Sequence, residues 1–379
     1  MRQNLFEIPV IGTLVPGYGL MLMIGFLTSI WWAARRAYKS GGNPDTILNC
    51  GFVAIIAGVV GCRTFFVIHY WPQFAAAGGP WEVFWSVVDV RKGGMEFYGG
   101  FVLSAIAIPL WLRLVEKVSV RWYVDIIAPS AALGLSIGRI GCFLNGCCWG
   151  GVCDQPWAVQ FPYGSTPQMS QWQKKTPGSE LPIDLMVKNG AMMIPIDGSV
   201  FMYSDATIAA RADKAMQAAA DREAAPQGSA ERNKAQARLA SLEPFYKIGL
   251  AEKQHGLSVA ELRALAHQHP SLPVHPTQLY SMLTALLIAL LLDAVYWRRS
   301  FDGQVLALLL IIEAPTRWLI ETIRADNPHD TFMGLTVSQT AAVLLTLTGV
   351  TIWVLASRLP KRSPKAEIWV PEEPAPAKA

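Results

Sequence analysis

Apolar positions in this chain come in long blocks separated by shorter polar segments. Seven of these blocks are about 20 residues long, enough for a helix rising ~1.5 Å per residue to cross a ~30 Å hydrocarbon layer. A helix also pairs its own backbone groups, as lipid requires. We therefore expect an all-α, polytopic membrane fold with about seven transmembrane helices. The blocks are centred on residues 14–34, 47–68, 97–114, 123–143, 277–296, 303–323 and 336–356.

A polar block lies between the fourth and fifth apolar ones. It becomes alanine-rich and charged from Asp205 to His269, which is typical of solvated helices. Pro226, Gly228 and Ser229 predict a break between two helices, and the sequence Ser258-Val259-Ala260-Glu261 predicts a capping box that opens a third. The predicted organisation is transmembrane helices 1–4 in residues 1–154, an inserted extracytoplasmic, partly helical segment in 155–272, helices 5–7 in 273–360, and a disordered cytoplasmic tail in 361–379.

Basic residues follow the first, third, fifth and seventh apolar blocks, which places these loops in the cytoplasm. The amino terminus is then outside and the carboxyl terminus cytoplasmic. The net charge of +4 is accounted for by these loops, so we expect no nucleic-acid partner. With 52% hydrophobic and only 16% charged residues, the composition excludes an ordinary soluble enzyme.

Two predicted helices carry charges that lipid would penalise. Arg139 lies towards the outer end of the fourth. A charge in a transmembrane helix costs roughly 2.5 to 3.5 kcal/mol near the membrane centre, so Arg139 is a candidate functional residue. Glu313, Arg317, Glu321 and Arg324 share one face of the sixth, where Arg317 and Glu321 are spaced to form an ion pair. The three guanidiniums are predicted at similar depth, and their planar donors suit the phosphate of a lipid headgroup. A structural salt bridge and an anion channel are the alternatives.

Two further segments are predicted at the same outer level. The sequence Gly93-Gly94-Met95-Glu96-Phe97-Tyr98-Gly99-Gly100 enters the third helix, and His275-Pro276-Thr277-Gln278-Leu279-Tyr280 enters the fifth. Paired glycines permit close approach of a ligand, while tyrosine, histidine and glutamine side chains offer hydrogen bonds.

Taken together, these motifs resemble the bacterial prolipoprotein diacylglyceryl transferase family. The resemblance covers nearly all of the chain except the insertion and the tail. It is carried by Tyr18-Gly19-Leu20-Met21, Gly61-Cys62-Arg63, Phe97-Tyr98-Gly99-Gly100, the segment from Gly138-Arg139-Ile140-Gly141 to Trp149-Gly150, His275 to Tyr280, and Arg317 through Glu321 to Arg324.

The resemblance implies an enzyme of the inner membrane with its active site near the outer leaflet. It would transfer a diacylglyceryl group from phosphatidylglycerol to the lipobox cysteine thiol of preprolipoproteins, without a metal or other cofactor. Membrane lipids and lipobox signal peptides are the implied partners. The implied catalytic residues are Arg139, Arg317, Glu321 and Tyr98, the last standing where some members have histidine. The implied substrate-binding residues are Tyr18, Arg63, Gly99, Gly100, Asn145, His275, Gln278, Tyr280 and Arg324.

Two of four clustered cysteines depart from the family pattern, which usually has asparagine at Cys142 and an acid at Cys147. Cys142, Cys147, Cys148 and Cys153 have the spacing C-x4-C-C-x4-C. Structural thiols or a disulfide, a modified active site and a metal site are all open interpretations, although the paired C-x2-C spacing of common zinc sites is missing. The alternative functions are accordingly a membrane thiol-redox or metal-binding protein, or a phospholipid-binding or anion-conducting protein.

Overall fold

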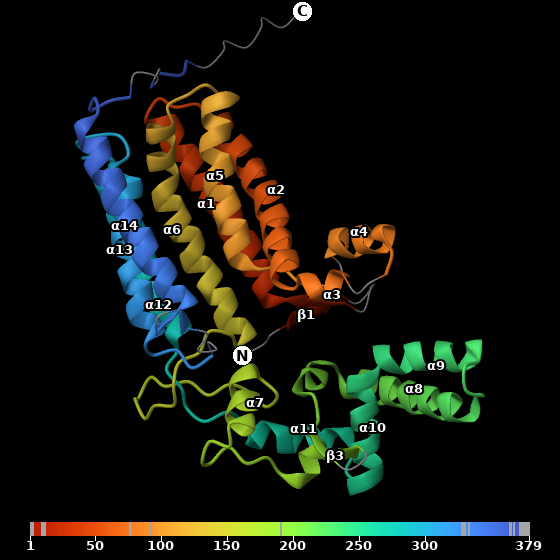
Figure 1. Ribbon diagram of the computed structural model, residues 1–379. Coiled ribbons are helices and arrows are strands. Elements are labelled where there is room, and N and C mark those ends of the chain that lie inside the picture. The colour runs from red at the N-terminus through yellow and green to blue at the C-terminus, as the bar shows by residue number, and fades with distance from the viewer. Residues whose placement is uncertain are drawn as a thin grey trace, which may run out of the picture. The chain divides into compact units, whose positions relative to one another are not determined.

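The computed structural model describes residues 4–8, 13–75, 78–90, 93–189, 192–326, 331–332, 334–363, 366 and 368–370. The described chain is mainly helical, and six of its helices are long and apolar enough to cross a membrane (Figure 1). The expected all-α polytopic membrane fold is therefore confirmed. These six helices are α1 (Gly17–Lys39), α2 (Pro44–His69), α5 (Phe97–Leu114), α6 (Val120–Asn145), α12 (Thr277–Tyr296) and α14 (Val337–Arg358).

The sixth predicted span corresponds to α13 (Gln304–Glu321), which is not among those six. The reason is composition, because its 18 residues include Glu313, Arg317 and Glu321. The remaining elements are short: helices α3 (Trp71–Ala75), α4 (Pro80–Val88), α7 (Thr166–Gln173), α8 (Asp205–Ala224), α9 (Ala230–Ser241), α10 (Glu243–His255) and α11 (Val259–Gln268), and the antiparallel pairs β1 (Asn4–Ile8) with β2 (Thr13–Pro16), β3 (Met186–Asn189) with β4 (Met192–Pro195), and β5 (Thr331–Phe332) with β6 (Leu335–Thr336).

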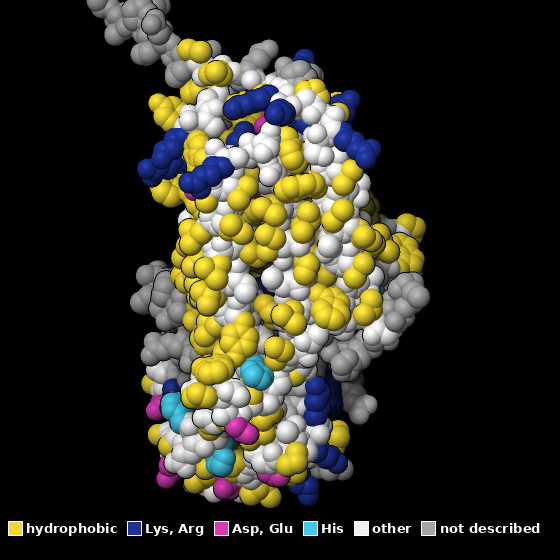
Figure 2. Space-filling model, turned by 90° about the vertical axis from the view of Figure 1, so that its left-hand side faces the viewer, with side chains coloured by type: hydrophobic (Ala, Val, Ile, Leu, Met, Phe, Trp, Pro, Cys, Tyr) yellow, Lys and Arg dark blue, Asp and Glu magenta, His cyan; other side chains and the backbone are white. Residues whose placement is uncertain are grey.

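The chain divides into two compact units. The first unit comprises Met1–Met21, Gly138–Met282 and Leu319–Thr336, and the second comprises Leu22–Ile137, Leu283–Trp318 and Val337–Ala379. In the second unit, the ends of α1, α5 and α14 lie together with the start of α6 (Figure 1). Hydrophobic side chains cover the long helices, and Lys and Arg gather at this end (Figure 2). The basic loops predicted to share one side of the membrane therefore share one end of the unit.

Close packing of α2 against α5 depends on glycine. A Cβ at Gly61 would lie 2.8 Å from Leu103 Cβ and would also meet the backbone of Gly99. A Cβ at Gly100 would lie 2.5 Å from Cys62 Sγ and 2.8 Å from the carbonyl oxygen of Gly58. Small residues let two apolar helices approach closely enough for backbone contact. Gly99 and Gly100 therefore serve a helix crossing, and their contact with a substrate stays a prediction.

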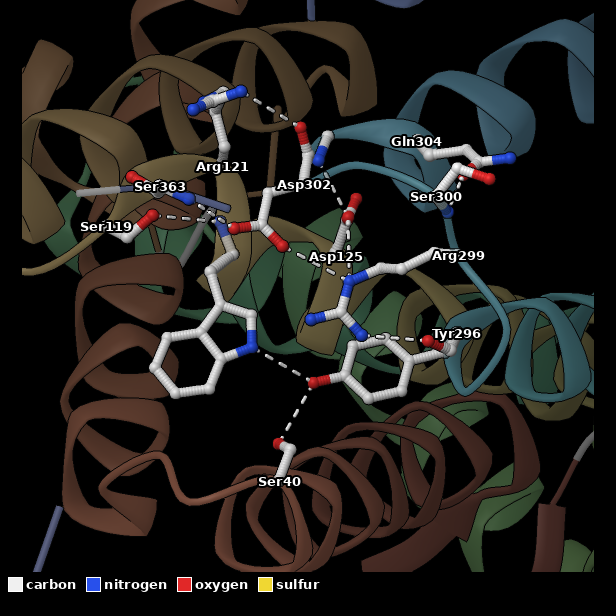
Figure 3. Close-up of polar contacts among 12 residues, drawn as sticks. Ser40, Ser119, Arg121, Asp125, Tyr296, Arg299, Ser300, Asp302, Gln304 and Ser363 are labelled. Atoms are coloured by element: carbon white, nitrogen blue, oxygen red, sulfur yellow. Dashed lines mark hydrogen bonds and ion pairs between the residues drawn. The ribbon is translucent and has the colours of Figure 1, made fainter. Parts of the chain in front are cut away.

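A polar network lies around a fully buried carboxylate in the second unit (Figure 3). Asp125 accepts hydrogen bonds from the backbone N–H groups of Gly303 at 2.7 Å and Leu306 at 3.0 Å, and thereby caps the start of α13. Its other close neighbour is the guanidinium of Arg299, which also donates to Asp302 at 3.3 Å. A buried acid is tolerated only with such partners. The sequence analysis did not single out these residues.

A buried cation, Arg36 of α1, is held in the same unit. Its Nη1 donates to the carbonyl oxygen of Ile126 at 2.7 Å and to Ser130 Oγ at 3.0 Å, and its Nε donates to Asp293 at 2.9 Å. These contacts join α1, α6 and α12 in the second unit.

The start of the carboxyl-terminal tail is attached to the second unit. Lys361 accepts a backbone hydrogen bond from Asp302 N at 2.9 Å, and Asp302 Oδ2 accepts one from Ser363 N at 2.8 Å. Further along, Trp369 N donates to the carbonyl oxygen of Gly41 at 2.8 Å. For these residues the contacts differ from the disordered tail predicted from position 361 onward, because buried Asp302 needs backbone donors. Residues 364, 365, 367 and 371–379 of that prediction lie outside the described residues.

The insertion has a hydrophobic core of its own within the first unit. Leu185, Ile208, Ile248 and Leu262 are fully buried in it. The predicted break separates α8 from α9, and Ser258 forms the predicted capping box with Glu261 at the start of α11. The structure adds α10, β3 and β4, which the sequence analysis did not predict.

Candidate functional site

The end of α6 fixes the geometry of the candidate site, which lies in the first unit. The helix closes with a Schellman motif, in which Gly146 has φ +74° and Cys147 N donates to the carbonyl oxygen of Cys142 at 3.2 Å. Two residues later Cys148 has φ +60°, a conformation uncommon outside glycine. The chain thus changes direction directly after the last turn of α6, the helix that carries Arg139.

This reversal brings three thiols together. The Sγ atoms of Cys142, Cys147 and Cys148, which we call the cysteine cluster, all lie within 4.8 Å of one another. All six cysteines of the chain are free in the structure, so none forms the disulfide considered from the sequence. Cys153 is not part of the cluster as described, and its backbone N–H pairs with Pro273.

Arg139 faces the cluster. Its Nη1 donates to Cys148 Sγ at 3.8 Å. Hydrogen bonds from the thiols of Cys142 and Cys147, together with the charges of Arg324 and Arg139, hold the pKa of the Cys148 thiol below its ordinary value, although burial opposes this. The positive charges of Arg324 and Arg139 therefore favour the thiolate form of Cys148.

The segment that enters α12 holds the cysteine loop in place. Gln278 Nε2 donates to the carbonyl oxygen of Cys147 at 2.7 Å, and Thr277 Oγ1 donates to that of Cys148 at 2.5 Å. His275 pairs through its backbone with Gly150 and Gly151, each at 3.0 Å. Two motifs that are far apart in the sequence are thus brought together, and their place at the outer side of the membrane stays a prediction.

The side chain of His275 contacts Tyr280 and not the cysteine loop. Its Nδ1 lies 3.3 Å from Tyr280 Oη, which accepts a hydrogen bond from Trp157 Nε1 at 2.7 Å. His275 and Tyr280 therefore form a polar group of their own, adjoining the loop through the backbone of His275.

An acidic residue beyond α13 completes the support of the loop. Asp326 Oδ2 accepts from the backbone N–H of Cys148 at 2.8 Å, and its Oδ1 accepts from Arg324 Nε at 3.0 Å. Arg324 also donates to the buried Glu321 at 3.0 Å. Burial opposes the charge of Arg324, but the hydrogen bond and charge of Asp326 raise its pKa above the ordinary value. Asp326 was not predicted from the sequence, although its place two residues after Arg324 indicates a candidate partner for that arginine.

Two polar atoms in this region are buried without a hydrogen-bond partner among the described residues. They are Arg139 Nε and Gln278 Oε1, one a donor and the other an acceptor. Gln278 is fully buried. Such atoms cost about 1–3 kcal/mol each when left unpaired, so they indicate a place where a ligand or water completes the site.

Two predicted substrate contacts lie next to these residues in the first unit. A Cβ at Gly141 would lie 3.2 Å from Tyr18 Cδ2, so the Tyr18 ring packs directly on α6. Asn145 lines a small pocket with Gly146, Phe161 and Tyr163.

Arg63, in the second unit, has a different role from the substrate contact expected of it. Its guanidinium donates to five carbonyl oxygens, those of Ser86, Val87, Asp89, Gly93 and Gly94, at 2.7 to 3.1 Å. These contacts use all five N–H donors of an arginine and leave none for a phosphate. Arg63 is thus a structural clasp for the loop before α5.

Tyr98 and Arg317 also belong to the second unit. Tyr98 lies in the first turn of α5, half-buried beside Phe97. Arg317 Nε donates to Ser338 Oγ of α14 at 3.2 Å. The predicted ion pair of Arg317 with Glu321, and its meeting with Arg139 and Arg324, stay predictions.

Comparison with known proteins gives consistent results. Residues 4–355 match the family model described as prolipoprotein diacylglyceryl transferase. Similar curated proteins are phosphatidylglycerol–prolipoprotein diacylglyceryl transferases of Rhodopirellula baltica, 38% identical over 158 residues (41% of this chain and 31% of that protein), and Pseudoalteromonas translucida, 39% identical over 152 residues (39% and 54%). A third, from Pectobacterium carotovorum, is 37% identical over 166 residues (41% and 55%). The matches thus span from 31% to 55% of the length of these relatives.

Proposed function

Because the chain belongs to the prolipoprotein diacylglyceryl transferase family, we propose that it transfers a diacylglyceryl group from phosphatidylglycerol to a cysteine thiol of preprolipoproteins. The observation that carries this proposal is the position of Arg139. Its Nη1 faces the cysteine cluster, and its Nε is buried without a partner in the described chain. A guanidinium with a free, desolvated donor is suited to an anionic oxygen.

The reaction is an S-alkylation. The acceptor thiolate attacks the glyceryl carbon that bears the phosphate ester, a C–S bond forms, and the C–O bond breaks with its electron pair on the departing glycerol phosphate. The thiol proton passes to water. Negative charge grows on the phosphate oxygens as the bond breaks, so fixed cations stabilise the transition state more than the ground state.

We assign the charge-stabilising role to Arg139 and, from the family resemblance, to Arg317. Arg324 is already paired with Glu321 and Asp326, so its contribution is to hold the loop and the local potential. Tyr98, as a phenol with an ordinary pKa of about 10, suits positioning of the acceptor or relay of its proton better than direct deprotonation. Tyr18 and Asn145 are proposed to contact the lipid or the acceptor.

The proposed setting is the inner membrane, with the amino terminus outside, the basic loops in the cytoplasm and the site near the outer leaflet. The distribution of Lys and Arg supports this orientation. A phospholipid then reaches Arg139 from the bilayer, and a lipobox peptide reaches it from its own membrane-inserted signal sequence.

The test uses the full chain in phospholipid vesicles containing acyl-labelled phosphatidylglycerol and a lipobox peptide. We expect the label to pass to the peptide in a thioether and glycerol phosphate to be released. A peptide with serine in place of the acceptor cysteine is the matched control and should stay unlabelled. If the cysteine peptide also stays unlabelled at saturating lipid, the proposal is wrong.

A further inference from the structure

The cysteine cluster has the ligand atoms and the geometry of a candidate metal site. Three free thiols from a stretch of seven residues converge to within 4.8 Å, from the last turn of α6 and the loop after it. A zinc ion bound by thiolates at ~2.3 Å with tetrahedral angles requires sulfur atoms about 3.8 Å apart. Small rotations of the cysteine side chains close that difference.

The backbone that carries these thiols is held from several sides. The carbonyl oxygens of Cys147 and Cys148 and the N–H of Cys148 are each bonded to a side chain, those of Gln278, Thr277 and Asp326, at 2.5 to 2.8 Å. Residues that fix ligands in this way preorganise metal sites. The left-handed backbone of Cys148 turns two adjacent side chains toward one point, which an extended pair would direct apart.

Charge also suits this reading. Zn²⁺ with three thiolates carries a net charge of −1, and Arg139 lies 3.8 Å from one of the sulfur atoms to balance it. Arg324 does not oppose the metal, because Glu321 and Asp326 already neutralise it.

Among the described residues, no fourth His, Cys, Asp or Glu belongs to the group. Zinc sites with three protein ligands leave one position for a water or a substrate. The transfer reaction needs a thiolate acceptor, and zinc deprotonates a thiol that coordinates it. An acceptor thiol bound at the open position of the zinc would therefore be present as the thiolate that the transfer needs.

We propose that Cys142, Cys147 and Cys148 bind a zinc ion whose fourth ligand is the acceptor cysteine of the substrate. The acceptor S–H loses its proton to water as the Zn–S bond forms. The bound thiolate then attacks the glyceryl carbon, the C–O bond breaks toward glycerol phosphate, and the resulting thioether, a weaker ligand, leaves the metal. The role of the acceptor rests on the proposed function, whereas zinc binding by the three cysteines does not.

Metal content tests the site directly. The full chain, purified in detergent without chelators, should contain about one zinc ion, detected by mass spectrometry. Cys142→Ser and Cys147→Ser should each reduce the zinc content at least tenfold, while Cys153→Ser, a cysteine of the same segment outside the cluster, should keep it. Gln278→Ala should weaken zinc binding about 10- to 100-fold through the Cys147 peptide. A wild-type chain without zinc, or with copper in its place, overturns the proposal.

Cobalt replacement separates this proposal from the proposed function. Co²⁺ in the cluster should give thiolate charge-transfer bands and the strong visible bands of a tetrahedral site. Adding the lipobox peptide should increase the charge-transfer intensity, and the serine peptide should not. Cobalt bands without diacylglyceryl transfer would reject the function and keep the metal site. Full transfer by a chain stripped of metal with a chelator would keep the function and overturn the zinc-bound acceptor. If the cysteine variants fold poorly, protection of three thiols from maleimide until a chelator is added gives the same answer in the unaltered chain.

Discussion

Gln278 donates a hydrogen bond to the carbonyl oxygen of Cys147 at 2.7 Å across 131 residues of chain. This contact joins the start of α12 to the loop after α6, and the insertion lies in the sequence between them. The two chain segments that flank the insertion are therefore hydrogen-bonded to each other. A large segment can be inserted between them without displacing the cysteine loop. Gly150, which pairs with His275, belongs to the same junction.

Arg139→Ala is expected to lower kcat/KM for diacylglyceryl transfer by roughly 100- to 1,000-fold, because it removes a cation at the departing phosphate. Arg139→Lys should stay well below the unaltered chain, since an ammonium lacks the planar fork. The measurement is thioether formation at equal amounts of membrane-inserted protein. Arg238→Ala, on the exposed side of α9, is the control and should transfer normally. Full activity in Arg139→Ala would remove the central residue of the mechanism.

Gly150→Ala should destabilise the junction of the cysteine loop with α12. The new Cβ would lie 2.6 Å from His275 Cβ and 2.9 Å from Thr277 Cγ2, a degree of overpacking that costs about 1–3 kcal/mol. Gly151→Ala is a close control, because the nearest atom to its Cβ is 3.9 Å away. Thermal unfolding in detergent should separate the two variants. Equal midpoints would mean that the loop adjusts freely.

Gly61→Ala should weaken the contact of α2 with α5. Its Cβ would lie 2.8 Å from Leu103 Cβ, and we expect a loss of about 1–3 kcal/mol in unfolding free energy. Gly58→Ala lies one turn earlier on α2, with its nearest neighbour at 3.7 Å, and should be tolerated. The comparison of their unfolding midpoints decides between packing and helix propensity, because both changes replace glycine with the same better helix former.

Arg63→Lys should loosen the segment before α5 while leaving the charge unchanged. Lysine has three donors and cannot replace five carbonyl contacts in a fixed plane. Trypsin should then cleave after Arg91 and Lys92 at least tenfold faster, because local opening controls cleavage. Arg113→Lys, at an exposed position in the last turn of α5, should cleave at the normal rate. Unchanged cleavage in Arg63→Lys would contradict the clasp.

Much of the membrane fold could be predicted from hydrophobic blocks alone, because each of the long helices needs only length and apolar composition. The predicted block at 277–296 coincides with α12, and the one at 97–114 with α5. The roles of Arg63, Gly99 and Gly100 were harder to predict. A motif indicates which residues have a role, but it does not show whether they contact a ligand or other parts of the chain. Arg63 satisfies backbone carbonyls of a loop, and no pattern in that loop announces it.

The cysteine cluster is a second feature whose role could not be predicted from the sequence. Spacing along the chain left its chemistry open, because adjacent side chains usually diverge and the paired spacing of common zinc sites is missing. Cys148 has a left-handed backbone although it is not a glycine, so the side chains of Cys147 and Cys148 converge. The sequence does not indicate this conformation. Asp125 was missed for a simpler reason, since a single acid within an apolar stretch was not weighed as a structural cap.

The attachment of the tail has a practical consequence for the preparation of this protein. A truncation placed before Lys361 would strip Asp302 of its bond from Ser363 and of the carbonyl that its own amide needs. Affinity tags and fluorescent fusions at this end should therefore follow residue 370. They then leave the hydrogen bond between Trp369 and Gly41 intact.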